Sequence, residues 1–465
     1  MKVLLIQPKN DAIGFTDLIL AEPLSLEMVA GAIYDHEVKI LDLRLENSLD
    51  SILSSFKPTL CGISCSYTID FHPTLKIAQA VKESSPETFI VVGGHHASMN
   101  YQDFASAEID AVVVGEGEET FKELVDALGM GMKGDLQKIP GLVLNEEGRQ
   151  VITPLRPLQR NLDFLPFPVR NGLERNRYHL GFQRPAALVE ASRGCTYQCS
   201  FCGVWQFYRR TYRSKTPERV VEELKQIREP FVLFVDDNFL MDIKRAGQIA
   251  NLVKAARLKK TYTFQARSDT IAEHPEILRL WREVGLRTVF IGFEKVKDEA
   301  LQALHKNNQV ENNDKALKIL QDLGIDVWAS FIVDPDYDHE DFRRLKDYIL
   351  DRRIKTPTFS VLTPLPGTEL FSQLREKLIS ENYNLFDIAH AVLPTKLTLK
   401  EFYEELCALY RLPYSIYQLI WEGFRAWLSR GFSLFHLLAM LRSVKRLSDP
   451  QCYLLAHRGL SNLKR

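Results

Sequence analysis

Three cysteines lie close together near the middle of the chain, and their spacing is that of a ligand set. Cys195, Cys199 and Cys202 form the pattern Cys-x3-Cys-x2-Cys within SRGCTYQCSFCGVW. Cysteine thiolates hold iron–sulfur clusters, and a [4Fe–4S] cluster normally takes four of them. Three protein ligands would leave one iron open to a small molecule. A zinc site needs four ligands, and the remaining cysteines, such as Cys407 and Cys452, include no second pair at this spacing.

Six short apolar runs surround this motif and predict the strands that position it. The strands are expected at 187–192, 231–236, 261–266, 288–293, 326–333 and 358–363, with amphipathic helices such as 217–229 between them. This alternation predicts a parallel sheet, and six repeats suit a partial (βα)6 barrel. The cysteines follow the first strand, at the end where barrel enzymes carry their active-site loops.

The first 152 residues predict a separate Rossmann-like α/β domain. Strands are expected at 2–7, 38–43, 60–65, 89–94 and 110–115, and helices at 73–85 and 118–128. Ligands of such sheets bind beyond the carboxyl ends of the strands. No G-x-G-x-x-G follows the first strand, which argues against a dinucleotide. Glycines instead follow two later strands, where small residues would admit a bulky flat ligand.

Composition and patterning complete the predicted organisation. A proline-bearing linker is expected at 153–185, the barrel at 186–370 and a helical region at 371–465. The formal net charge of -1 gives no sign of nucleic-acid binding. No apolar run is long enough to span a membrane, and the odd count of seven cysteines predicts a cytoplasmic protein. The aromatic and basic segment 414–446 predicts either a helix packed on the barrel or one in a membrane interface.

With Phe201 before its last cysteine, the cysteine motif resembles the signature of the radical S-adenosylmethionine (SAM) superfamily. The resemblance implies that SAM chelates the open iron and that its reductive cleavage yields a 5′-deoxyadenosyl radical, which abstracts a hydrogen atom. It also implies SAM contacts at Phe201, Gly203, Asp236, Asp237, Arg267, Gly292, Glu294 and Leu365. A helix cap at Asp236 and Asp237, a surface salt bridge at Arg267 and a plain Pro-Gly turn at 362–371 remain alternatives. The Asp-Pro-Asp sequence after the fifth strand departs from the family's glycine-containing turn.

The order of the two domains resembles the cobalamin-dependent radical SAM enzymes. The matching pieces are Gln7-Pro8, Pro23-Leu24, GISCSYT, GGHHAS and VVGEGEET. They imply a cobalamin site at Gln7, Pro8, Ser64, Cys65, Tyr67, Gly93, Gly94, His95, His96, Ser98, Gly115, Glu116 and Gly117. His95 and His96 could equally cap a helix. The D-x-H-x-x-G motif of a cobalt-ligating histidine is absent, so we expect cobalt without a protein ligand, its lower face covered by Tyr67 or a neighbour. His72, in the near match Asp70-Phe71-His72, is the alternative.

Among these enzymes, the chain most resembles the hopanoid C-3 methylases. The resemblance implies methyl transfer from methylcobalamin to an unactivated carbon of a triterpenoid lipid. It also implies a one-electron reductant such as flavodoxin or ferredoxin, and peripheral contact with the inner membrane. The alternatives are an oxidative cyclase like those of bacteriochlorophyll synthesis, a methylthiotransferase and a non-enzymatic carrier. A methylthiotransferase would need a second cluster, yet the first domain holds only Cys61 and Cys65.

Overall fold

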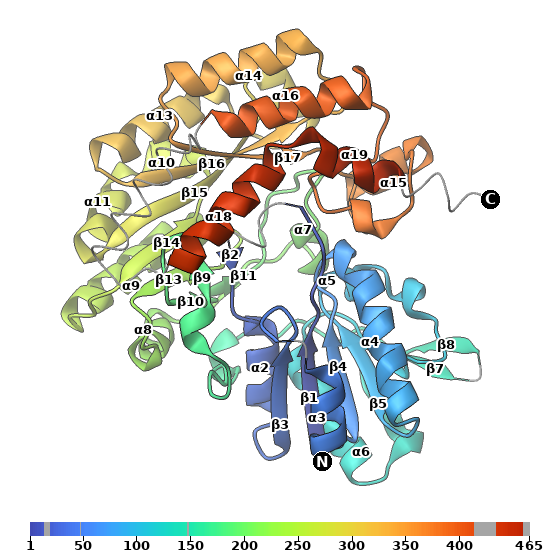
Figure 1. Ribbon diagram of the computed structural model, residues 1–465. Helices are drawn as coiled ribbons and strands as arrows, with labels where there is room; N and C mark the ends of the chain where they lie inside the picture. Colours follow the sequence, from blue (N-terminus) through green and yellow to red (C-terminus); the bar gives the residue numbers. More distant parts are fainter. Residues whose placement is uncertain (14–18, 47, 147, 413–433, 459–465) are drawn as a thin grey trace.

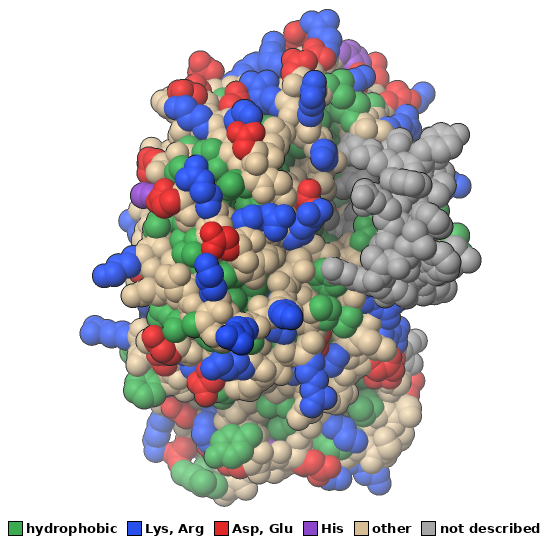
Figure 2. Space-filling view, turned by 90° about the vertical axis from the view of Figure 1, so that its left-hand side faces the viewer, with side chains coloured by type: hydrophobic (Ala, Val, Ile, Leu, Met, Phe, Trp, Pro, Cys, Tyr) green, Lys and Arg blue, Asp and Glu red, His purple; other side chains and the backbone are tan. Residues whose placement is uncertain are grey.

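Two mainly parallel sheets, each flanked by helices, form the framework of the molecule (Figure 1). The structure is a computed structural model that describes residues 1–465 except 14–18, 47, 147, 413–433 and 459–465. The predicted fold class, a Rossmann-like domain followed by a six-stranded partial barrel and helices, is confirmed. On the face shown in Figure 2, basic and acidic side chains are interspersed.

The amino-terminal sheet has the strand order β3-β1-β4-β5-β6-β7-β8, in which the pairs β6–β7 and β7–β8 are antiparallel and the other pairs are parallel. Two cores cover its faces: helices α2 and α6 pack on one side, and α3 and α4 on the other. The strands are β1 (Lys2–Gln7), β3 (Glu37–Asp42), β4 (Leu60–Ser64), β5 (Phe89–Gly93), β6 (Ala111–Val113), β7 (Leu142–Glu146) and β8 (Arg149–Ile152). The helices are α2 (Leu24–Ala32), α3 (Leu49–Phe56), α4 (Phe71–Ser84) and α6 (Gly117–Gly129).

The second sheet keeps the chain order of its six strands, and all of its pairs are parallel. It comprises β10 (Ala186–Val189), β13 (Phe231–Phe234), β14 (Thr261–Gln265), β15 (Leu286–Glu294), β16 (Asp326–Val333) and β17 (Thr356–Val361). Its outer face is covered by α8 (Pro217–Gln226), α9 (Ile243–Ala255), α11 (Pro275–Val284), α13 (Val310–Asp322) and α14 (His339–Asp351). Alternate residues such as Val289, Ile291 and Phe293 face these helices, so Phe290 and Gly292 face the lumen.

The segment between the two sheets packs on both of them. Its strand β9 (His179–Leu180) pairs with β2 (Ile19–Leu20) of the first domain. The Tyr178 hydroxyl donates to Asp42 at the end of β3, at 3.1 Å. Leu24 and Met28 of α2 pack against Leu188 of β10. The proline-bearing stretch therefore joins the domains through a shared core.

The carboxyl-terminal region is only partly helical. Helices α15 (Glu369–Leu374), α16 (Leu399–Arg411), α18 (Leu434–Leu447) and α19 (Pro450–Arg458) are present, but 378–398 contains one 3₁₀ turn and is otherwise irregular. The expectation of helix throughout was wrong there, because this segment closes the barrel end through the Val361 N–H, which donates to the Ile388 carbonyl at 2.7 Å. Helix α16 packs on the barrel core. Most of the predicted aromatic and basic segment lies outside the described residues, and no described helix is long and apolar enough to cross a membrane.

Candidate cofactor and active site

The loop that carries the three cysteines follows β10 and is fixed by neighbouring barrel elements. Gly194 begins it with a φ of 87°, where a Cβ would lie 2.2 Å from the Thr211 carbonyl oxygen. The Trp205 indole N–H donates to the Cys199 carbonyl at 3.0 Å. The Ser200 N–H donates to Leu304 and the Ser200 carbonyl accepts from the Leu370 N–H, at 3.0 and 2.9 Å. The loop is thus bound to segments after β15 and β17.

The cysteines fit an iron–sulfur cluster better than a single zinc ion. Tetrahedral zinc at about 2.3 Å from each sulfur would place its ligand atoms roughly 3.8 Å apart. Among the described residues, only Asp35, His36 and Asp126 bring three potential ligand atoms within 4.8 Å of one another, so at least one pair of the cysteine sulfurs lies farther apart than that. Burial raises the pKa of all three thiols, that of Cys202 to about 12. Iron binding must therefore displace protons.

Asp236 and Asp237, which follow β13, hold the protein's own backbone. Asp236 is 1% exposed and accepts from the Ala191 N–H at 3.0 Å and from the Ser192 hydroxyl. Asp237 accepts from the Gly194 N–H at 3.1 Å. Burial raises their pKa values, to about 6 and about 7 respectively. The next helix, α9 (Ile243–Ala255), is capped by Asp242, so the capping alternative is wrong, while the SAM contacts of Asp236 and Asp237 stay predictions.

Residues after β14 and β15 gather charged groups near the cysteine loop. Arg267 lies 3.6 Å from the Tyr197 ring centroid, and it donates to Asp269 and to two backbone carbonyls. Glu294 forms an ion pair with Lys306 at 2.8 Å. A Cβ at Gly292 would lie 2.1 Å from the Glu294 carboxylate, so this pair needs a glycine there.

Lys306 was not among the predicted site residues. It lies on the loop after α12 (Asp298–Ala303), away from any strand end, and it is 8% exposed. Burial lowers the pKa of its ammonium, but the Glu294 and Cys199 charges raise it more, so the pKa lies above its ordinary value. A cation beside Cys199 is suited to a carboxylate ligand at that loop.

The remaining predicted SAM residues lie on turns. Phe201 and Leu365 are half-buried, and the Leu365 carbonyl accepts from the Thr368 N–H at 3.1 Å. Thr368 also caps α15, since its hydroxyl accepts from the Phe371 N–H at 3.1 Å. The Pro-Gly segment is therefore a turn and a helix start, and the Leu370–Ser200 bond places it beside the cysteine loop.

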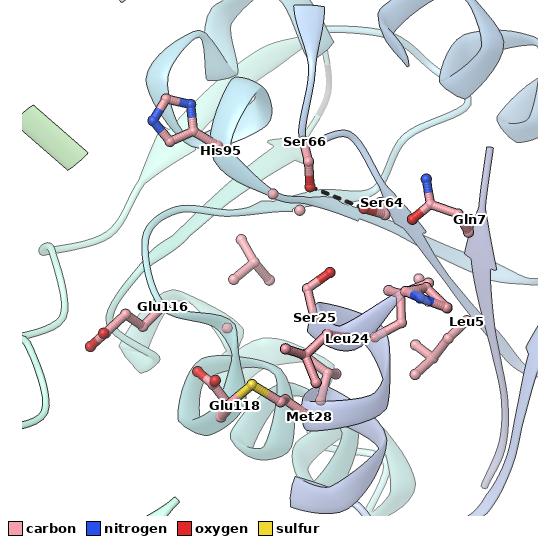
Figure 3. A pocket seen from close by; sticks show the side chains of 18 of the residues that line it. Leu5, Gln7, Leu24, Ser25, Met28, Ser64, Ser66, His95, Glu116 and Glu118 are labelled. Carbon is pink, nitrogen blue, oxygen red and sulfur yellow. Dashed lines mark hydrogen bonds between the residues drawn. The ribbon is translucent and has the colours of Figure 1, made fainter. Parts of the chain in front are cut away.

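A cavity of about 420 Å³ lies at the carboxyl ends of β1, β4, β5 and β6, between the two domains. Figure 3 shows His95 and Ser66 on one side and α2, with Leu24, Ser25 and Met28, on the other. The predicted cobalamin residues that line it are Gln7, Ser64, Tyr67, Gly93, Gly94, His95, Gly115, Glu116 and Gly117. Gly115 has a φ of 90°, and no heavy atom beyond its chain neighbours lies within 4 Å of the position that a Cβ would take. The size and small-residue lining suit a large cofactor inserted between the domains.

Tyr67 and His95 are two of the polar rings that line the cavity. Tyr67 is 68% exposed and lines the cavity, so its ring is free to cover a bound ligand. His95 is stacked on Phe207 with ring centroids 5.0 Å apart. Burial lowers the pKa of His95, which keeps its imidazole neutral at physiological pH.

Four predicted cobalamin residues, and the alternative cobalt ligand His72, do not line the cavity: Pro8, Cys65, His96, Ser98 and His72. Cys65 is fully buried in the sheet core. The His96 imidazole lies 3.2 Å from the Thr68 hydroxyl and packs edge-on to Tyr383. The Ser98 hydroxyl instead accepts from the Gly115 N–H at 2.9 Å, which supports the glycine loop from behind.

Charged residues at the domain interface also line the cavity. Arg193 is 5% exposed and pairs with Glu116, Glu118 and Glu190 at 2.9, 2.5 and 2.7 Å. Burial raises the pKa of Glu116, but hydrogen bonds and charges of Arg213 and Arg193 outweigh it and lower the pKa. The predicted ligand Glu116 is therefore engaged with arginines. The partner Arg193 was missed because interdomain pairs leave no local sequence pattern.

Comparisons with known proteins agree with this arrangement. The Radical SAM superfamily matches residues 189–349, and the B12 binding domain matches 18–125. The hopanoid C-3 methylase of Methylococcus capsulatus is 35% identical over 87% of this chain and 79% of its own length. An uncharacterized methyltransferase of Pyrococcus horikoshii is 30% identical over 85% of this chain and 88% of its own length.

Solved structures share the fold. The radical SAM methyltransferase TsrM of Kitasatospora setae, with cobalamin and a [4Fe–4S] cluster bound, superposes with a TM-score of 0.67 at 20% identity, covering 85% of this chain and 82% of that one. The cobalamin-dependent radical SAM enzyme OxsB, with aqua-cobalamin and SAM bound, gives 0.69 at 17% identity, covering 100% and 75%.

Proposed function

The chain belongs to the radical SAM superfamily and is a cobalamin-dependent methyltransferase, and we propose that its acceptor is an unactivated carbon of a triterpenoid lipid, C-3 of a hopanoid. Its cofactors are a [4Fe–4S] cluster, SAM and cobalamin. When bound, they supply hydrogen-atom abstraction from the substrate and a methyl group for the same carbon. The observation that supports this most is the cysteine loop beside a glycine-lined cavity at the domain interface.

The lumen of the barrel supports a neutral, apolar substrate. Most residues facing it from β14 to β17 are uncharged: Thr263, Gln265, Phe290, Trp328, Ser330, Thr358 and Ser360. The exception is Glu294 at the end of β15, whose carboxylate lies beside Gly292 and is paired with Lys306. Phe290 and Trp328 form an edge-on pair with ring centroids 5.5 Å apart, and both are half-buried. Aromatic surface of this kind favours burial of a flat hydrocarbon. The hydroxyls around it can bond isolated polar groups.

We assign the cofactor-holding roles to residues whose positions in the structure suit them. Cys195, Cys199 and Cys202 hold the cluster, and Lys306 with Glu294 forms the polar SAM subsite. Gly93, Gly115 and Gly117 would make room for the corrinoid, and Tyr67 would cover its lower face. Electrons come from a small reductant such as flavodoxin or ferredoxin. The lipid acceptor implies transient membrane contact, which co-sedimentation with hopanoid-containing vesicles would test.

Metal content after anaerobic purification with cobalamin tests the cofactor set. We expect about four iron and about one cobalt per chain. The triple variant Cys195→Ala/Cys199→Ala/Cys202→Ala should lose the iron. The matched control Cys407→Ala/Cys452→Ala removes two cysteines elsewhere and should keep it. An intact iron–sulfur spectrum in the triple variant would contradict the assignment.

Transfer of a labelled methyl group from SAM to hopanoid extracts tests the acceptor. Trp328→Ala should lower kcat/KM at least about 10-fold, because burial of an aromatic surface contributes about 1.5–3 kcal/mol. Lys318→Ala, on the exposed outer side of α13, should change it little. Labelled product with other lipids only would refute the hopanoid assignment. An oxidised product without a new methyl group would favour the cyclase alternative instead.

A further inference from the structure

Helix α5 (His95–Met99) is a single turn of the first domain that reaches the catalytic loops of the second. Gly94 before it has a φ of 118°, and a Cβ there would lie 2.7 Å from the Cys65 carbonyl oxygen. The backbone at the start of α5 is therefore held close to the end of β4. The imidazole of His95 projects from this fixed point into the cofactor cavity (Figure 3).

The same imidazole also packs closely against the cysteine loop. A Cβ on Gly203, the residue after Cys202, would lie 2.7 Å from His95 Cε1 and 3.1 Å from its Nε2. The same Cβ would lie 3.8 Å from the Thr368 Cγ2, which is an ordinary van der Waals distance. At the far end of α5, a Cβ on Gly367 would lie 2.7 Å from the Met99 Cβ. Helix α5 thus packs tightly on both loops around the SAM site.

We propose that His95 is a positioning residue that couples occupation of the corrinoid cavity to the geometry of the iron–sulfur cluster. One edge of its ring faces the cavity. The ring also packs against the backbone of Gly203, the residue after the cluster ligand Cys202. The inference rests on the proposed cofactor set but goes beyond it, because it makes the two cofactor sites mechanically dependent on each other.

Close packing gives the physical basis for this coupling. Protein interiors transmit small displacements because they hold few voids. Phe207 stacks on one face of the imidazole, which limits its sideways movement. A corrinoid that pushes the ring must then shift Gly203 and, with it, the Cys202 ligand.

The test compares the cluster with and without cobalamin in the full-length protein. In the wild type, saturating cobalamin should shift the electron paramagnetic resonance spectrum and the midpoint potential of the reduced cluster. His95→Ala should keep its iron and, at a cobalamin concentration that saturates the variant, lose that shift. His274→Ala, an exposed histidine on the barrel exterior, should retain it. A shift in His95→Ala equal to that of the wild type would overturn the proposal.

A second pair of variants separates contact from folding failure. Gly203 has φ −83° and ψ −12°, which alanine adopts freely, so Gly203→Ala should be harmed only by the His95 ring. We expect it to lower iron occupancy and Tm, and His95→Ala/Gly203→Ala to recover both. Additive losses in the double variant would refute the contact. Failure of the wild type to bind cobalt would instead overturn the proposed function, and this coupling with it.

Discussion

Glu27 belongs to a buried ionic network that joins α2, the linker and the barrel. Arg175 pairs with Glu22, with Glu27 at 2.7 Å and with Glu229 at 2.7 Å. Arg170 and Lys215 both pair with Glu223, at 2.9 and 3.0 Å. Four carboxylates therefore face three cations. A protonated Glu27 leaves the network neutral, and Glu27 is fully buried.

Burial, reinforced by the Glu22 charge, raises the pKa of Glu27 to about 9. The unfolded chain releases this proton near pH 4.5, so between these values the folded state binds one proton more. The stability from that proton is full below the unfolded pKa and is lost as pH rises through the folded pKa. The free energy of unfolding should fall by about 1.4 kcal/mol per pH unit from this group.

Glu27→Gln removes the titrating proton. The amide N–H of the glutamine can donate to Glu22 in place of the protonated carboxyl. Between pH 6 and 8 the wild type should lose about 3 kcal/mol more than the variant. Urea unfolding of the cofactor-free protein, followed by tryptophan fluorescence, measures both slopes. Glu229→Gln is the matched control: burial raises the pKa of Glu229, but Arg175 lowers it further, so this change should destabilise the protein equally at both pH values. If the free energy of unfolding of Glu27→Gln fell with pH as steeply as that of the wild type, Glu27 would not be the protonated carboxyl.

Two further predictions concern the cofactor sites. Arg193→Met leaves Glu118 and Glu190 buried without their cation, so the free energy of unfolding should fall by about 3–5 kcal/mol in urea titrations; an unchanged midpoint would contradict the network. Lys306→Met should weaken SAM binding at least about 10-fold in equilibrium dialysis, since a charged hydrogen bond contributes about 1.5–3 kcal/mol, while iron content stays at the wild-type level.

The local sequence pattern was sufficient to predict the strands and the cysteine loop. Apolar runs such as 60–65 and 326–333 become β4 and β16 with nearly the same bounds. All residues of β4 are buried, and a strand buried on both faces is apolar over nearly its whole length. The glycines at 93, 94, 115 and 117 line the cavity as predicted from their places after strands. Their roles toward cobalamin stay predictions.

The polar partners were harder to predict because they join segments distant in the sequence. Asp236 occupies the predicted strand end, yet its carboxylate accepts a hydrogen bond from the Ala191 N–H, just after the neighbouring strand β10. Lys306 lies on a loop without a strand or helix boundary to mark it. Helix α2 did carry a signal: LSLEMVAGA is apolar on more than one face, and such a helix is buried all round. Leu26 packs on the sheet, while Leu24 and Met28 contact the barrel.

The elements that dock the two domains are also the walls of the cofactor cavity. Helix α2 contributes Leu24, Ser25 and Met28 to the lining and Glu27 to the interdomain network. A ligand that binds the docked form alone stabilises it by mass action, so cobalamin and domain docking must reinforce each other. Weakening the network far from the cavity should then lower cobalamin affinity. Glu229 contacts Arg175 outside the lining, so in Glu229→Gln a loss of affinity would come through docking and not through direct contact.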